Sequence, residues 1–494
     1  MLFNSLRFVV FLIVVLAAVR LGGLRRRNWL LLIASFTFYG LGSWFYHPAT
    51  VTSIHEFDWG RLKGALGFLA LLCFNCGVAY TCGLRIADSQ EAAHRQRWCT
   101  VGVCTSVAIL CFFKYWGFFL NNLYAALHAV GLGGAHPLVT IILPIGISFY
   151  TFQAIAYMID VYRGTTPVCR SLRDFLLFKG FFPQLVAGPI ERANHLLPQI
   201  QNPRPIQNAD ILEGLYLVLW GFVKKCVIAD NLALKIGRIY TQDAFTSGDV
   251  LLAALGFTFQ AYADFSGYTD IARGVARWFG VHLMQNFNHP YYATSPQDFW
   301  RRWHISLGTW LREYLYIPLG GNRKGAFRTW LNLVITMLVG GLWHGPSWNY
   351  VIWGAYQGLI LSLHRAYVAW RGERRHTHLS RTFAIAGNFL LTMYGMLIFW
   401  LIPHEDASSW QRISAATSAI FSFDAGPEFL ARFVRMLPYI GLILLMETPV
   451  FLTKNQWFFV HRRPVVLAAV YLFLFYCLLV LGVTGGDQFI YFAF

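Results

Sequence analysis

Long apolar stretches separated by short polar segments run along most of this chain of 494 residues. A helix needs ~20 predominantly apolar residues to cross a bilayer. Eight stretches approach that length, at about 8–22, 28–45, 64–83, 98–120, 137–160, 382–403, 429–452 and 464–483. The pattern predicts an all-α polytopic membrane protein.

The first polar connections differ in their content of Lys and Arg. The segment 20–28 holds four arginines, 84–97 and 161–173 hold three each, and 121–136 holds none. Because cytoplasmic loops carry an excess of Lys and Arg, we expect the three basic loops inside and the N-terminus outside. The run at 8–19 resembles a signal peptide, but its basic cluster follows it, which favours a first span.

The middle of the chain, 174–328, is less regular. Apolar stretches at 211–223 and 249–263 are long enough to be considered as spans. The segment 174–190 contains Pro183, Gly188 and Pro189 and is too broken for a straight span. We expect it to be kinked or re-entrant, which a membrane tolerates only where protein or a water-filled cavity satisfies the backbone.

Two further segments complete the predicted topology. Residues 298–316 mix arginines with Trp and Tyr on an apolar spacing, which is typical of a helix along the cytoplasmic interface. The 36 residues from Thr329 to His364 contain no Lys, Arg, Asp or Glu, and Gly345 and Pro346 in their middle favour a turn. This predicts two crossings, and ten to twelve in all, within one integral-membrane domain over residues 1–494.

Composition excludes other classes of protein. Hydrophobic residues make up 56% of the chain and charged residues 13%, whereas a soluble domain carries about 25% charged residues. The net charge of +17 lies in short loops between apolar runs, which indicates an anionic membrane surface and argues against nucleic acid. There is no P-loop, no G-x-S-x-G elbow, no zinc-ligand spacing and no ladder of intramembrane acids. Group transfer across the membrane is therefore favoured over bulk transport.

His344 is the strongest candidate for chemistry. It follows Arg328 by 16 residues, so a helix would carry it roughly 24 Å from the basic platform at 1.5 Å per residue. A neutral imidazole at that depth can take a proton from a hydroxyl. The alternative is a packing histidine bonded to backbone at the Gly-Pro turn.

Three other residues are weaker candidates. His304 could act in chemistry or be a histidine at the headgroup boundary, and His289 before a proline is expected to lie in a loop. Asp264 is expected to be a buried carboxylate paired with Arg273 or Arg277, a structural role favoured over catalysis.

Arg301 and Arg302 form a basic pair beside His304. Adjacent guanidinium groups can hold the phosphates of a cytosolic ligand. The pair could equally anchor the segment under the positive-inside rule. Both interpretations remain open from the sequence.

Several motifs together resemble one family. The runs DFWRRWHISLGTWLREYLYIPLGGNR (298–323) and TMLVGGLWHGPSWNYVIWG (336–354) resemble those of the membrane-bound O-acyltransferases. The resemblance is to the bacterial branch with the alginate O-acetyltransferase membrane subunit and the teichoic acid D-alanyl transferase. Matching stretches at 142–164, 181–192 and 259–274 extend it over most of the chain.

The resemblance implies a bundle of about eleven spans around a central tunnel, with a catalytic histidine inside. That histidine falls on His344, as general base, and the second family histidine falls on His304, for donor positioning or carbonyl polarisation. Trp303 and Trp343 are expected to line or support the tunnel, although packing alone would also explain them. Asp264, Arg301 and Arg302 are further candidates for substrate contacts, and no metal is expected.

The resemblance also implies the reaction. The donor would be a cytosolic thioester, acetyl-CoA or an acyl-carrier protein, with no tightly bound cofactor. An acyl group, expected to be acetyl, would pass across the bacterial inner membrane to a hydroxyl, for O-acetylation of a cell-surface polysaccharide directly or through a periplasmic partner. The alternatives are a non-catalytic exporter of lipid or polysaccharide, and a scaffold for a soluble acyltransferase. The acceptor and the oligomeric state stay open.

Overall fold

The computed structural model describes residues 3, 5–46, 59–132, 141–240, 242, 244–372, 377–403 and 408–483. This part of the chain is built from helices and contains no β-strand. Seven of its helices are long and apolar enough to cross a membrane. The predicted all-α polytopic fold is confirmed.

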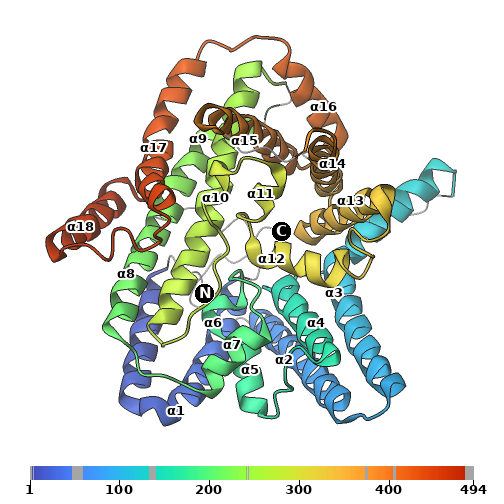
Figure 1. Ribbon diagram of the computed structural model, residues 1–494, viewed down its shortest axis with the longest axis vertical. Helices are drawn as coiled ribbons and strands as arrows, with labels where there is room; N and C mark the ends of the chain where they lie inside the picture. The colour runs from blue at the N-terminus through green and yellow to red at the C-terminus, as the bar shows by residue number, and fades with distance from the viewer. Residues whose placement is uncertain are drawn as a thin grey trace. The chain divides into compact units, whose positions relative to one another are not determined.

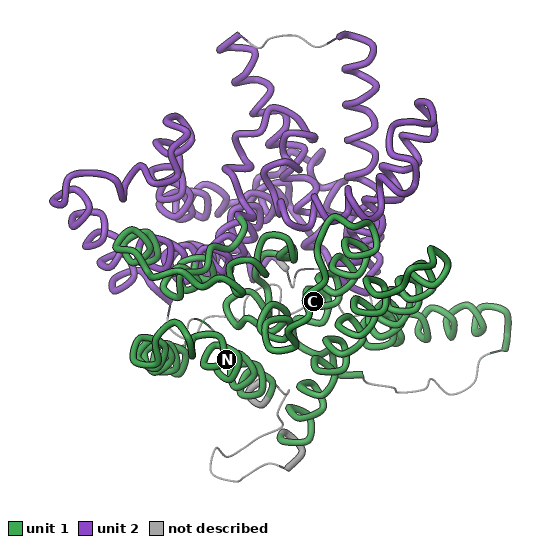
Figure 2. The backbone as a smooth tube through the Cα atoms, turned by 60° about the horizontal axis from the view of Figure 1, so that its bottom comes forward, with its two compact units in different colours: residues 1–215, 271–284 green, residues 216–270, 285–494 purple. Residues whose placement is uncertain are grey.

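The chain divides into two compact units, coloured green and purple in Figure 2. Unit 1 comprises residues 1–215 and 271–284, and unit 2 comprises residues 216–270 and 285–494. Two helices run from one unit into the other, α8 (Asn208–Phe222) and α10 (Ser247–Arg277). The expectation of a single functional domain over the whole chain stays a prediction.

Unit 1 holds most of the N-terminal helices (Figure 1). They are α1 (Leu6–Tyr46), α2 (Trp59–Asp88), α3 (Ala92–Ala129), α4 (Ile147–Arg163), α5 (Leu172–Gly180), α6 (Phe182–Leu185) and α7 (Ala193–Gln201). Helix α2 packs against α1, α3 and α4, and α1 also packs against α5.

Helix α1 contains the first two predicted spans. The backbone breaks at Gly23, which has φ 69° and ψ 177°. Beyond the break the chain folds back, because the rings of Phe8 and Phe11 lie 6.1 and 5.7 Å from that of Phe38. Glycine adopts this positive φ without a Cβ clash, so the turn between the two predicted spans is placed at this residue.

The following spans differ from their predicted limits. Helix α3 runs for 38 residues, which is about 57 Å at 1.5 Å per residue and longer than the stretch 98–120 predicted. Helix α4 begins only at Ile147, ten residues after the predicted start of 137–160. Gly146 before it has φ 72°, and a Cβ there would lie 2.7 Å from the carbonyl oxygen of Leu185. The segment 174–190 is broken between α5 and α6, as predicted.

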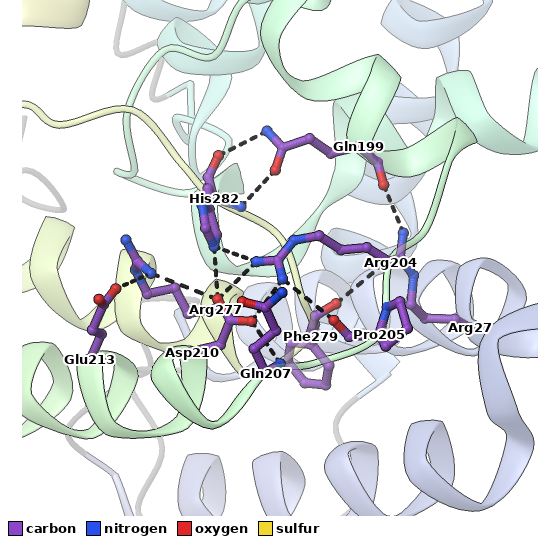
Figure 3. A network of polar contacts seen from close by, with 10 residues as sticks. All are labelled: Arg27, Gln199, Arg204, Pro205, Gln207, Asp210, Glu213, Arg277, Phe279 and His282. Atoms are coloured by element: carbon purple, nitrogen blue, oxygen red, sulfur yellow. Dashed lines mark hydrogen bonds and ion pairs between the residues drawn. The ribbon is translucent and has the colours of Figure 1, made fainter.

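A polar network holds the return segment 271–284 within unit 1 (Figure 3). Arg204 donates to both carboxylate oxygens of Asp210, at 2.9 and 2.8 Å, and His282 Nε2 lies 2.8 Å from Asp210 Oδ1. Burial by itself would raise the pKa of the Asp210 carboxyl, but the hydrogen bonds from Arg204 and His282 lower it to about 2. Arg277 forms ion pairs with Glu213 and Asp210 in the same network.

Arg27 extends this network to α1 (Figure 3). Its guanidinium is buried and donates to the carbonyl oxygens of Gln199 at 2.9 Å and Phe279 at 3.3 Å. These bonds join three segments that are far apart in the sequence. The sequence predicts that Arg27 lies in a basic loop. In unit 1 its guanidinium instead joins separate backbone segments by hydrogen bonds.

Unit 2 holds the remaining helices (Figure 1). They are a π-helix η1 (Val223–Ala229), α9 (Asp230–Tyr240), η2 (Pro290–Tyr292), α11 (Pro296–Trp300), α12 (Ile305–Leu311), a second π-helix η3 (Arg312–Tyr316), α13 (Gly325–His344), α14 (Trp348–Arg371), α15 (His378–Trp400), α16 (Ser409–Ile420), α17 (Phe429–Thr453) and α18 (Pro464–Leu481). The connection between the predicted spans 382–403 and 429–452 includes α16, whose start is capped by the Ser408 side chain.

The predicted segment 298–316 is not one continuous helix. It divides into α11, α12 and η3, and His304 between the first two has φ 42°. In contrast, the predicted turn after His344 is confirmed: α13 ends at His344, and α14 starts at Trp348. Of these two helices, α13 is among the seven candidate spans, and a second crossing by α14 stays a prediction.

Close backbone contact joins α13 to α14. A Cβ on Gly341 would lie 2.2 Å from the carbonyl oxygen of Tyr350, and one on Gly354 would lie 2.5 Å from that of Met337. Small residues let helices approach in this way inside membranes, where apolar burial alone gives no drive to associate. This contact fixes the end of α13, which carries His344.

The Gly341→Ala substitution tests this contact. Overpacking costs about 1–3 kcal/mol, so we expect a lower thermal unfolding temperature in detergent. Gly67→Ala in α2 is the control, because a Cβ there meets nothing within 4 Å. Equal unfolding temperatures for the two variants would contradict the tight α13–α14 contact.

Candidate active site

His344 is enclosed by aromatic rings. It is the last residue of α13 and is 5% exposed. The rings of Trp343, Trp353 and Phe399 lie 5.0, 5.2 and 5.0 Å from the imidazole, each edge-on to it. Edge-to-face packing is the favoured arrangement of such rings, so the imidazole is held in a rigid apolar shell.

The wall formed by Phe399 is tied to α14. The Asn349 side chain, buried in the first turn of α14, donates to the carbonyl oxygen of Phe399 at 2.9 Å. This bond joins the start of α14 to the end of α15 and holds Phe399 against His344. The local sequence ends α13 here because Gly345 and Pro346 cannot continue the helix.

His304 also contacts Trp343. The His304 ring is 5.7 Å from that of Trp343 and 4.7 Å from that of Phe265. The structure therefore brings the two predicted histidines together around one indole. His304 is fully buried and outside the seven span helices. Burial lowers the pKa of its imidazole to about 3, so the ring is neutral at physiological pH.

Hydrogen bonds from the segment 286–288, called the strap below, hold the backbone at His304. Ile305 N donates to the Asn286 carbonyl at 2.9 Å, and Asn288 N donates to the Arg302 carbonyl at 2.9 Å. A left-handed φ is uncommon for a residue with a Cβ and persists only when its surroundings impose it. The strap supplies that constraint.

Trp303 packs in a cluster of aromatic rings that continues to His304 through Phe287 and Phe265. Its ring lies 5.5 Å from Phe299, 5.0 Å from Phe287 and 6.2 Å from Tyr262. It is the support for the His304 segment, whereas Trp343 contacts both histidines directly.

Glu447, which the sequence analysis missed, closes this cluster from α17. Its two carboxylate oxygens accept hydrogen bonds from the Tyr262 hydroxyl, at 2.6 and 2.8 Å. His289 Nδ1 lies 3.2 Å from the same carboxylate. His289 is in the loop before η2, as predicted, with φ 48°. An acid inside an apolar span is the signal that could have identified Glu447.

An arginine-lined pocket of about 650 Å³ opens in unit 2. Its cationic lining comes from Arg301, Arg312, Arg323 and Arg365, and no carboxylate is among its described lining residues. Arg302 is directed elsewhere: its Nε donates to Asp298 at 2.8 Å. The predicted basic pair is therefore divided, with only Arg301 at the pocket.

Two indoles connect the wall of this pocket to His344. Trp300 lines the pocket, and its ring lies 6.0 Å from that of Trp353, which packs against the imidazole. Trp300 Nε1 donates to Gln357 Oε1 at 3.3 Å. The pocket and the histidine thus share one wall.

Comparison with known proteins identifies the family. A probable alginate O-acetylase AlgI of Pseudomonas putida is 42% identical over 401 residues, 81% of this chain and 77% of the relative. That of Azotobacter vinelandii is 43% identical over 403 residues, with 81% and 75% covered. The chain belongs to the membrane-bound O-acyltransferase family. A sequence model of this family matches residues 169–402, which include His304 and His344.

A peptidoglycan O-acetyltransferase of Helicobacter pylori is also similar to this membrane-bound O-acyltransferase. It is 38% identical over 336 residues, which is 61% of each chain. The resemblance seen in the motifs is confirmed, and the protein is an integral membrane enzyme of the O-acyltransferase class.

Asp264 of this O-acyltransferase is in a buried ion cluster. Lys225 Nζ lies 2.8 Å from Asp264 Oδ1 and 2.8 Å from Asp230 Oδ1. The predicted pairing of the carboxylate is found, but its partner is Lys225 and Arg277 pairs with Glu213 instead. Lys225 reaches both acids because it lies in the π-helix η1, whose wider turn changes the faces that side chains present.

We predict that Lys225→Met destabilises the enzyme far more than Asp264→Asn. Lys225→Met leaves two buried carboxylates without this cation, which costs about 3–5 kcal/mol. Asp264→Asn leaves Asp230 to pair with the lysine. Thermal unfolding in detergent measures the difference. Loss of acyl transfer in folded Asp264→Asn protein would contradict a purely structural role for this aspartate.

Proposed function

We propose that this enzyme transfers an acetyl group from a cytosolic thioester to a hydroxyl on the far side of the membrane. The product would be an O-acetylated cell-surface polysaccharide, formed directly or through a periplasmic partner. The names of its relatives, alginate O-acetylase and peptidoglycan O-acetyltransferase, support the acetyl group and the polymer.

One observation carries the chemical proposal. A buried histidine lies at the end of a candidate spanning helix and is connected to a basic pocket through Trp353 and Trp300. A thioester is already activated. The protein has to orient it, remove a proton from the acceptor hydroxyl and exclude water. His344 is suited to the proton transfer because its apolar shell keeps the ring in one place.

The steps balance without a cofactor. His344 takes the hydroxyl proton as the oxygen bonds to the thioester carbonyl carbon. The carbon–sulfur bond then breaks, and the imidazolium returns the proton to the leaving thiolate. His304 is neutral and fixed in a left-handed backbone. We assign it to positioning the donor or polarising its carbonyl.

The arginine-lined pocket suits the donor. The phosphates of CoA, or the phosphopantetheine of an acyl-carrier protein, match guanidinium groups that have no competing carboxylate in the pocket lining. Of the two roles that the sequence left open for Arg301, phosphate binding is the one we assign. Arg302, bonded to Asp298, supports the segment and is not assigned to the donor.

The orientation follows from loop charge. With the basic loops inside, the pocket-lining arginines face the cytosol and the N-terminus is outside. Such an enzyme would lie in the bacterial inner membrane, with its partner and polymer acceptor in the periplasm.

His344→Ala tests the proposed function. Because general-base catalysis contributes about 10²–10⁴-fold, we expect O-acetyl ester on the polymer to fall to background while the protein still inserts and folds. Ester content of isolated polysaccharide by mass spectrometry measures this. His304→Ala should impair transfer more than His289→Ala. Normal ester content in His344→Ala cells would favour an exporter or a scaffold instead.

Substitution of the pocket arginines tests the donor site. Each exposed charge contributes up to about 1 kcal/mol, or about fivefold. Arg301→Ala should therefore raise KM for acetyl-CoA about fivefold, with a smaller effect at high salt. Arg371→Ala is the control, since Arg371 is exposed on α14 outside the pocket lining. Equal KM values for both variants would remove the pocket from the proposal.

A further inference from the structure

The structure points to a water barrier between the donor pocket and the catalytic base. We propose that Trp300, held by Gln357, is a plug that keeps water from His344, so that the thioester is passed to an acceptor hydroxyl and is not hydrolysed. This inference rests on the proposed function and assigns Trp300 and Gln357 as specificity-determining and positioning residues, respectively.

The position of Trp300 is the first argument. It ends α11 and lines the pocket beside Arg301, whose side chain is exposed. Behind it the ring of Trp353 lies at 6.0 Å and 65°, and the ring of Trp353 lies 5.2 Å from His344. The lining of the pocket is therefore connected to the histidine through the Trp300 and Trp353 indoles.

The fixation of Trp300 is the second argument. Its indole N–H donates to Gln357, which is 4% exposed and lies on α14. Gln357 is itself confined, because a Cβ on Gly395 of α15 would lie 2.8 Å from its Nε2. A buried amide in a fixed place gives the indole one preferred orientation across the wall.

Chemistry supplies the reason for such a barrier. A base that removes a proton from an alcohol also removes one from water. In that reaction the water oxygen bonds to the thioester carbonyl carbon, the carbon–sulfur bond breaks, and acetate and free thiol result. No further reactant is needed, so the donor would be wasted whenever water reached His344. Exclusion of water from the site prevents this reaction.

Donor binding can still displace the Trp300 indole. A neutral hydrogen bond contributes little net stability because its partners bond to water when it breaks, and this one is long at 3.3 Å. Binding of donor phosphates to the pocket arginines can offset the cost of displacing the indole. The wall is then open only while the donor occupies it.

Trp300→Ala tests the plug in the purified full-length enzyme. Release of free thiol from acetyl-CoA without acceptor measures hydrolysis, and polymer ester in cells measures transfer. Acetylated acyl-carrier protein is assayed in parallel. We expect the ratio of hydrolysis to transfer to rise about tenfold as water enters the site. Gln357→Leu, which keeps the apolar bulk of the side chain, should shift the ratio in the same direction by less.

Trp330→Ala is the matched control, because Trp330 lies on α13 outside the pocket lining. Its ratio should stay at the wild-type value. If hydrolysis and transfer fall in proportion in Trp300→Ala, the indole only holds the donor and the plug is overturned. An unchanged ratio in both Trp300→Ala and Gln357→Leu overturns it as well.

A double variant separates this inference from the proposed function. Hydrolysis gained by Trp300→Ala should disappear in Trp300→Ala/His344→Ala, because the same base serves both nucleophiles. Hydrolysis that persists would keep the plug but remove His344 as the base. Failure of the plug alone leaves a different result: polymer ester that depends on His344, with no gain of hydrolysis in any Trp300 variant.

Discussion

The need to satisfy buried polar groups from within the protein shapes the rest of this structure. Apolar surroundings offer no water to a carboxylate or an amine, so each such group needs a protein partner. Lys225 forms ion pairs with two aspartates. The Glu447 carboxylate accepts a hydrogen bond from a tyrosine hydroxyl and contacts a histidine. These pairings join helices that apolar contacts alone would leave free to slide.

The same constraint positions the chemistry. Glu447 holds His289, which continues the strap whose backbone bonds lie on both sides of His304. On the other side, glycine contacts between α13 and α14 fix the end of α13, where His344 lies. The Trp343 ring contacts both imidazoles, so both supports act on residues around one indole.

The proposed site separates charge from proton transfer. Arginines line the pocket, where solvent can hydrate them when the proposed donor is absent. The proposed base lies behind Trp300 and Trp353 in an apolar shell. An acyl thioester suits this arrangement, because its charge is remote from the reacting carbon and its activation needs no metal or nucleotide hydrolysis.

The sequence by itself determined the helical membrane class, most of the spans, the turn after His344 and the two histidine motifs. These are properties of short stretches: hydropathy, Gly-Pro turn chemistry and motif spacing act within about 20–40 residues. It also indicated that Asp264 would be paired and that arginines would gather near His304.

Only the tertiary structure decided which partners meet. Asp264 forms an ion pair with Lys225, and Arg302 forms one with Asp298. Trp300 donates a hydrogen bond to Gln357, 57 residues away. Element limits also differ from those predicted. The connection between the spans 382–403 and 429–452 contains a helix, and α4 starts at Ile147, ten residues after the predicted start of 137–160. Such choices depend on which faces of distant helices come together, and on π-turns that rotate those faces, neither of which is encoded in a local pattern.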